Sequence, residues 1–172
     1  IMDTMKGLKR THYCGEVEGI GNTVVVGGYV QKIRDMGTLI FIDLRDRTGI
    51  VQLSFNDQTD RDIFALAQSA RSEYVVAATG VVAERESKNK DIPTGDIEII
   101  VNDFRIISKA KTPPFEIEKS EKVGDETTLK YRYLNLRNEK LTKNILMRHK
   151  IAKIAREYFY ANDFIEIETP MM

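Results

Sequence analysis

A large aromatic ring stands among charged residues in the stretch TLIFIDL, residues 38–44. Because side chains alternate along a strand, Phe41 shares a face with Asp43, and the aliphatic side chains take the other face. A ring on a polar face can stack on a nucleic-acid base, an interaction worth roughly 1–3 kcal/mol per base. The alternative is an exposed phenylalanine without a binding role, which is ordinary on protein surfaces.

Other polar side chains fall where they can join such a face. Arg34 can grip a phosphate or the acceptor edge of a base, and Gln52 can both donate to and accept from a base edge. Strand alternation directs Glu98 outward, and its carboxylate only accepts hydrogen bonds, so it would select bases that present amino or imino protons. Asn89 lies in the loop before this strand. A charged residue on a strand is usually only solvated, but together with Phe41 these residues favour binding of single-stranded nucleic acid.

The composition excludes several other classes of function. The 172 residues carry 26 Lys and Arg against 26 Asp and Glu, so net charge gives no general case for a nucleic-acid or membrane partner. One cysteine and two histidines predict neither a disulfide nor a metal site. We find no nucleophile–base pair and no phosphate-cradling glycine loop, and therefore predict no catalytic residue. Without a signal sequence or a membrane-length apolar run, we expect a reducing, cytoplasmic location and no membrane partner.

The elements that must position these residues follow a regular order. Five strand patterns are interrupted by one helical pattern after the third, which is typical of an OB-fold, a five-stranded Greek-key barrel. A five-stranded α+β sandwich is the structural alternative. The glycine pair at 27–28 favours the barrel, because a first strand shared by both sheets must bend sharply. The predicted strands are residues 23–30, 38–44, 50–55, 74–84 and 97–107, and the helix is 59–73.

The remainder of the chain predicts a second, incomplete region. Residues 109–126 contain a proline pair and no periodicity, so we place the barrel domain at 1–108 and a linker or hinge at 109–138. Residues 139–172 then start another domain, with a helix at 139–162 and a short strand at 164–170. The helix has a wide apolar band with little chain to pack on, which predicts a fragment of a longer protein.

Basic residues gather in the second region. From Lys130 to Arg156 there are nine basic residues and one acidic residue. Such a run can track a phosphate backbone. It is equally consistent with the solvated side of the long helix.

Five stretches of the sequence closely resemble the N-terminal part of bacterial-type aspartyl-tRNA synthetases. The central stretch and LKYRYLNLR are shared more loosely with the lysyl and asparaginyl enzymes, whereas the opening stretch and KTPPF favour the aspartyl branch. The stretches are RTHYCGE (10–16), GYVQKIRDMGTLIFIDLRDRTGIVQ (28–52), KTPPF (111–115), LKYRYLNLR (129–137) and FIEIETPMM (164–172).

The resemblance implies that the OB-fold is an anticodon-binding domain for tRNA(Asp). Arg34, Phe41, Gln52, Asn89 and Glu98 match, by motif position, family residues that contact anticodon bases, with Phe41 as the stacking ring. The alternatives are the same region of a lysyl- or asparaginyl-tRNA synthetase, or a non-enzymatic OB protein that binds single strands.

The resemblance also implies that the long helix and FIEIETP are motif 1 of a class II α+β catalytic domain. Motif 1 forms the homodimer interface in that class, and here Ile151, Ile154, Phe164 and Pro170 would contribute to it. Motifs 2 and 3, which hold ATP and Mg²⁺, would lie beyond Met172. The complete enzyme would activate aspartate with ATP and transfer it to tRNA, whereas this fragment alone would be inactive.

Overall fold

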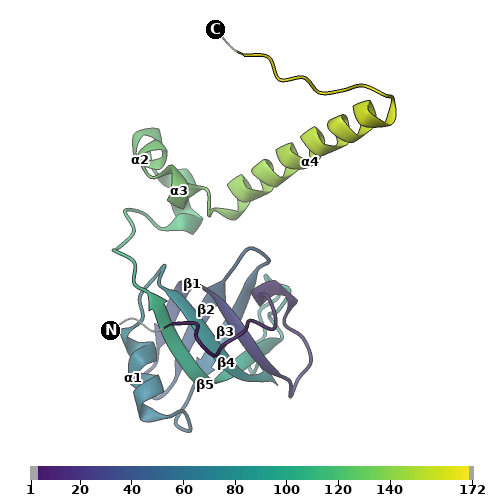
Figure 1. Cartoon of the computed structure of the whole chain (residues 1–172). Coiled ribbons are helices and arrows are strands. Elements are labelled where there is room, and N and C mark those ends of the chain that lie inside the picture. The colour runs from purple at the N-terminus through teal and green to yellow at the C-terminus, as the bar shows by residue number, and fades with distance from the viewer. Residues whose placement is uncertain (1–3, 171–172) are drawn as a thin grey trace. The chain divides into compact units, whose positions relative to one another are not determined.

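The computed structural model describes residues 4–170, and its internal contacts divide the chain into two units between Pro113 and Pro114. The first unit is a closed barrel with the strand order β1-β2-β3-β5-β4 (Figure 1). Neighbouring strands are antiparallel except β3 and β5, which are parallel. The predicted OB-fold is therefore confirmed, and the open sandwich is excluded. The strands are β1 Thr23–Asp35, β2 Ile40–Arg45, β3 Ile50–Phe55, β4 Val75–Glu84 and β5 Ile97–Ser108.

Strand β1 is shared by the two halves of the barrel. Its first part, Thr23 to Tyr29, pairs with β4, and its second part, Tyr29 to Asp35, pairs with β2 with a register shift between Val30 and Lys32. At the crossing, a Cβ atom on Gly28 would lie 2.4 Å from the carbonyl oxygen of Arg45. The glycine is therefore required by the close approach of β1 and β2 as well as by the bend.

Aliphatic side chains fill the barrel interior. Helix α1, Arg61–Ser69, lies between β3 and β4 in the chain and packs beside β5 (Figure 1). It begins at Asp60, whose side chain accepts from the backbone nitrogen of Asp62 at 2.9 Å. Its apolar side packs on the core because those residues recur at helical spacing. The fully buried side chains include Val24, Val26, Val30, Ile40, Ile42, Leu44, Val51, Leu53, Phe55 and Ile99.

The N-terminal segment is hydrogen-bonded to the hairpin between β2 and β3. The short helix η1, Cys14–Glu16, donates from the Cys14 nitrogen to Asp46 Oδ2 at 2.8 Å and from the Gly15 nitrogen to Thr48 Oγ1 at 2.9 Å. Burial alone would raise the pKa of Asp46, but hydrogen bonds from Cys14 and Thr48 outweigh it and lower that pKa. The hairpin that joins β2 and β3 is thus held at its turn.

The second unit consists of helices. The predicted linker contains η2 Ile117–Lys122, α2 Asp125–Lys130 and α3 Arg132–Asn135. It is followed by α4, Glu139–Ala161, which confirms the predicted helix to within one residue. Asn138 caps α4 through a hydrogen bond from the Lys140 nitrogen and also donates to the carbonyl of Ile117 at 3.0 Å. The predicted domain limits themselves stay predictions.

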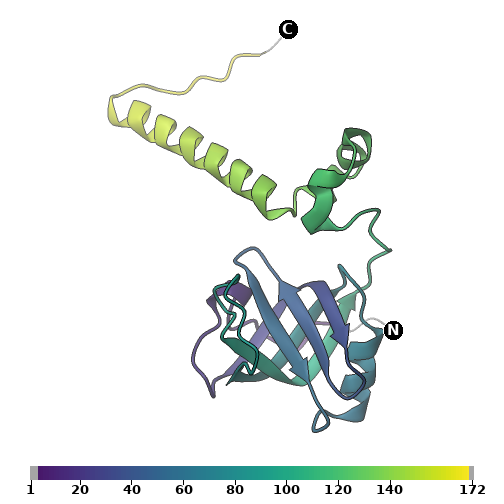
Figure 2. The same cartoon turned by 180° about the vertical axis from the view of Figure 1, so that it is seen from behind.

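The strand predicted at residues 164–170 is wrong for this chain. Figure 2 shows the chain after α4 as an extended segment without strand pairing. Glu166 in that segment instead pairs with Arg156, with Oε2 3.1 Å from the arginine Nε. A strand needs a neighbour to take its hydrogen bonds, and residues 114–170 contain no other strand.

Candidate nucleic-acid interface

Strand register brings four of the five predicted anticodon residues to one outer face of the barrel. Arg34 of β1 stands opposite Phe41 of β2. Gln52 of β3 stands opposite Asp43 of β2 on one side and Glu98 of β5 on the other. Directly opposite side chains on one face of a sheet lie in contact range, so these residues converge from four strands.

A continuous chain of hydrogen bonds connects this face. Arg34 Nη2 donates to Asp43 Oδ1 and to Gln52 Oε1, both at 2.8 Å. Gln52 Nε2 in turn donates to Glu98 Oε2 at 2.6 Å. We call Arg34, Asp43, Gln52 and Glu98 the outer-face network.

Phe41 lies beside this network and stays half-buried. The Arg34 guanidinium carbon is 5.8 Å from the centre of the Phe41 ring, within the range of a cation–π contact. The ring is therefore held next to a positive charge on a polar surface. A base stacked on Phe41 would have the donors of Arg34 and the acceptors of Glu98 within the same surface.

Gln52 is more buried than its outward position on β3 suggests. The residue is 4% exposed because its neighbours lie across it, and both ends of its amide are already engaged. One amide hydrogen and one oxygen lone pair remain. The Arg34 and Asp43 side chains retain 33% and 22% of their exposure, so the charged groups are the ones presented to a ligand, with Gln52 joining them.

Among residues 4–170, Asn89 has no hydrogen bond to the outer-face network. It belongs to the loop between β4 and β5, where its backbone nitrogen donates to the Gly95 carbonyl at 2.9 Å. Its side-chain oxygen accepts from the Asp91 nitrogen at 3.0 Å. The structure gives Asn89 a part in shaping this loop, and its contact with a base stays a prediction.

The structure adds two polar residues that the sequence did not single out as binding residues. Asp43 holds Arg34. Arg85 follows β4 and is 9% exposed, and its Nε atom is buried with no hydrogen-bond partner among residues 4–170. Ala83, two residues earlier, pairs directly with Glu98, so strand alternation puts Arg85 on the outer side near that carboxylate. Extending the alternation of β4 by one residue in the sequence would have predicted this outward position of Arg85.

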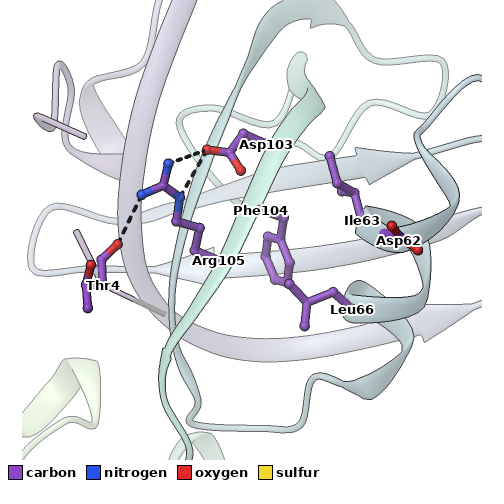
Figure 3. Close-up of a pocket in the computed structure, with 7 residues that line it drawn as sticks. All are labelled: Thr4, Asp62, Ile63, Leu66, Asp103, Phe104 and Arg105. Atoms are coloured by element: carbon purple, nitrogen blue, oxygen red, sulfur yellow. Dashed lines mark hydrogen bonds and ion pairs between the residues drawn. The ribbon is translucent and has the colours of Figure 1, made fainter. Parts of the chain in front are cut away.

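A separate pocket lies between α1 and β5 (Figure 3), and none of its lining residues belongs to the outer-face network. Arg105 contacts the Asp103 carboxylate at 3.2 Å and donates to the Thr4 carbonyl at 3.1 Å. These bonds tie the N-terminal segment to β5. The pocket is lined by Thr4, Asp62, Ile63, Leu66, Asp103, Phe104 and Arg105.

The second unit presents a different kind of surface. No residue of α4 is buried, and Ile151 and Ile154 are exposed. Phe164 and Pro170, in the segment after the helix, are exposed as well. The predicted interface residues are therefore accessible in the single chain, and their contact with a second subunit stays a prediction.

Comparison with known proteins defines the class to which the chain belongs. Residues 24–107 match the OB-fold nucleic acid binding domain of the anticodon type, and residues 124–172 match class II tRNA synthetases (D, K and N). The chain therefore combines an anticodon-type OB-fold with a segment that matches class II synthetases.

Relatives narrow this class further. The chain is 49% identical to the aspartate–tRNA ligase of Ruminiclostridium cellulolyticum and 51% identical to the aspartate–tRNA(Asp/Asn) ligase of Thermoanaerobacter sp. (strain X514). Each match covers 99% of this chain and 29% of the relative's length. The predicted resemblance to aspartyl-tRNA synthetases is confirmed, and the chain spans less than a third of the length of these relatives.

A solved structure supports the fold. The asparaginyl-tRNA synthetase of Pyrococcus horikoshii, complexed with asparaginyl-adenylate, aligns with a TM-score of 0.80 and 26% identity. The alignment covers 95% of this chain and 37% of that chain. Within residues 4–170, no helix combines the length and apolar character required to cross a membrane.

Proposed function

We propose that the barrel binds the anticodon loop of an aspartate tRNA, and that the protein to which this chain belongs attaches aspartate to that tRNA in the cytoplasm. One observation carries the proposal. Phe41 and the outer-face network share one surface of a domain that matches the anticodon-binding family.

Each residue has a distinct task in this proposal. Phe41 stacks on one anticodon base with little preference for its identity. Arg34 attracts a phosphate or the acceptor edge of a base. Glu98 accepts hydrogen bonds from amino or imino groups. Gln52 lies between Arg34 and Glu98 and fixes the distance between these two charged side chains. Asn89 and Arg85 contribute from the loop beside Glu98.

The complete enzyme would use ATP and Mg²⁺ to activate aspartate before its transfer. Residues 4–170 place no three His, Cys, Asp or Glu side chains where they could hold a metal ion. We therefore assign no Mg²⁺ ligand among these residues. The contribution of this chain to the reaction is to select the tRNA.

Binding to three RNA stem-loops tests the proposal. We expect the complete chain to bind a stem-loop with an aspartate anticodon more tightly than stem-loops with lysine or asparagine anticodons. A preference for the lysine or asparagine anticodon would assign the chain to the corresponding branch. Equal binding to all three and to an unstructured oligonucleotide would support a general single-strand-binding protein instead.

We propose also that α4 and the segment after it form a homodimer interface, as motif 1 does in class II synthetases. Exposed apolar side chains along α4, among them Ile151 and Ile154, support this assignment, because such a surface is stabilised by burial against a partner. We assign Phe164 and Pro170, which are exposed in the segment after the helix, to the same interface.

Sedimentation of the complete chain tests this interface. We expect self-association that weakens when Ile151 and Ile154 are both replaced by Asp, since a buried charge without a partner is costly. The control replaces Lys150 and Lys153 by Gln and should associate as the wild type does. A wild-type chain that stays monomeric at high concentration would contradict an interface formed by these residues alone.

A further inference from the structure

Asp43 is the one member of the outer-face network without a task in the proposed reading of the anticodon. We propose that Asp43 is a positioning residue that orients Arg34 and so turns general attraction for RNA into discrimination between bases. This inference rests on the proposed anticodon function of the barrel. It assigns Asp43 no contact with the base itself.

The geometry of Arg34 carries the inference. A single nitrogen, Nη2, donates to both Asp43 Oδ1 and Gln52 Oε1 at 2.8 Å. Two acceptors on one nitrogen fix the plane of the guanidinium, because its donors form a rigid fork. Arg34 is opposite Phe41 in the strand register, so its bond to Asp43 is a diagonal contact along β2. That diagonal pull holds the guanidinium 5.8 Å from the ring centre.

The rest of the guanidinium is then available in a fixed direction. Among the described residues, Nη1 makes no hydrogen bond, and Nε is buried without a partner. A base edge or phosphate near Phe41 therefore meets the Nη1 donors in one orientation. Discrimination between bases depends on such orientation, whereas attraction to phosphate depends mainly on charge.

Removal of the Asp43 charge should have two opposite effects. Arg34 would keep its charge but lose its charged partner, so its long side chain could reach phosphates in many arrangements. The loss of a negative charge would also reduce repulsion of the RNA backbone. General affinity should therefore rise while discrimination falls. A residue that only stabilised the fold would not produce this opposition.

The experiment measures binding of the complete chain to two stem-loop RNAs, one with an aspartate anticodon and one with a single anticodon base changed. For Asp43→Asn, we expect the ratio of the two affinities to fall about tenfold, within the range expected for a well-oriented arginine. Affinity for the changed stem-loop should rise about threefold at low salt, as expected for one charge near a phosphate. The rise should shrink with added salt, and the loss of discrimination should persist.

Asp103→Asn is the matched control. It makes the same charge change and also breaks an aspartate–arginine pair, with Arg105 at 3.2 Å, but it lies at the separate pocket on β5 (Figure 3). We expect the wild-type ratio for this variant. The ratio compares two affinities of one protein sample, so an inactive fraction cancels from it. A wild-type ratio in Asp43→Asn, or an equal loss in both variants, would overturn the positioning role.

A double-mutant cycle with Arg34→Ala separates positioning from direct contact. If Asp43 acts through Arg34, adding Asp43→Asn to Arg34→Ala leaves the ratio unchanged. A further fall in the ratio would mean that Asp43 reads the base itself and would overturn the inference. A wild-type chain that binds both stem-loops equally would instead overturn the proposed anticodon function, which distinguishes the two failures.

Discussion

The two units of this chain place their apolar side chains in opposite ways. The barrel encloses aliphatic residues such as Ile42 and Leu53 completely, and it presents a hydrogen-bonded polar network on its outside. Helix α4 buries none of its residues and exposes Ile151 and Ile154. The barrel therefore has a core of its own and a surface suited to a polar ligand. The second unit has a surface suited to an apolar one, which agrees with a segment of a larger catalytic domain.

Replacing one isoleucine in each unit is the strongest test of this difference in burial. We expect Ile42→Ala to lower the free energy of unfolding of the barrel by about 2–5 kcal/mol, because it leaves a cavity in a closed core. Ile154→Ala removes the same atoms from an exposed position and, at protein concentrations at which the chain is monomeric, should change the free energy of unfolding by less than about 0.5 kcal/mol. Urea denaturation followed by circular dichroism measures both. Equal effects would mean that α4 already packs on something in the free chain.

Removing one ring from each unit compares their ligands. We expect Phe41→Ala to weaken binding to the aspartate stem-loop by about 1–3 kcal/mol, the value of one base stacked on an aromatic ring. Phe159→Ala removes an exposed ring of α4 and should leave RNA binding unchanged. Isothermal titration calorimetry gives both affinities. Unchanged binding by a folded Phe41→Ala variant would reject the stacking role.

Carboxylates of the two units should differ in their effect on stability. Asp46 accepts hydrogen bonds from Cys14 and Thr48, which lower its pKa. We expect Asp46→Asn to destabilise the barrel by about 1 kcal/mol at neutral pH, near the net value of a hydrogen bond. Since the folded-state pKa lies below the unfolded value of about 3.9, this stabilisation is present above that value. It is lost as the pH falls through the folded-state pKa.

The control for Asp46 is a carboxylate on the exposed unit. The pKa of Glu166 is also lowered, mainly by its hydrogen bond with the Arg156 guanidinium, but both side chains are exposed. Exposed pairs contribute little, so Glu166→Gln should leave the unfolding curve unchanged at every pH. Urea denaturation at several pH values compares the variants. A destabilisation by Asp46→Asn that persisted below the folded-state pKa would show that its charge is not the cause.

The barrel could be predicted from sequence because its signals are local. Alternation in TLIFIDL placed Phe41 on the outer side, and the order of strands and helix defined the fold. Contacts between distant strands could not be predicted in the same way. Gln52 is covered because Arg34 and Glu98 lie across it, and Asp43 reaches Arg34 diagonally. Strand phase gives the direction of a side chain but not the neighbours that cover it.

The second unit was predicted less well for a related reason. Helix α4 is long and periodic, so its pattern was clear, whereas η2, α2 and α3 are too short to show a period. Residues 164–170 have strand-forming side chains, but propensity cannot supply the neighbour that a strand requires. Arg85 was missed because it lies just past the end of β4, where the sequence reads as a polar loop.

The parallel pairing of β3 with β5 also determines when the recognition surface forms during synthesis. Glu98 follows Gln52 by 46 residues, and β5 must enter between β3 and β4 to close the barrel. A nascent chain on the ribosome therefore displays Phe41, Arg34 and Asp43 before the carboxylate that completes the network has been translated. Such long-range pairings form late because loop closure must precede them. The selective RNA binding proposed for the barrel therefore requires that β5 has been synthesised.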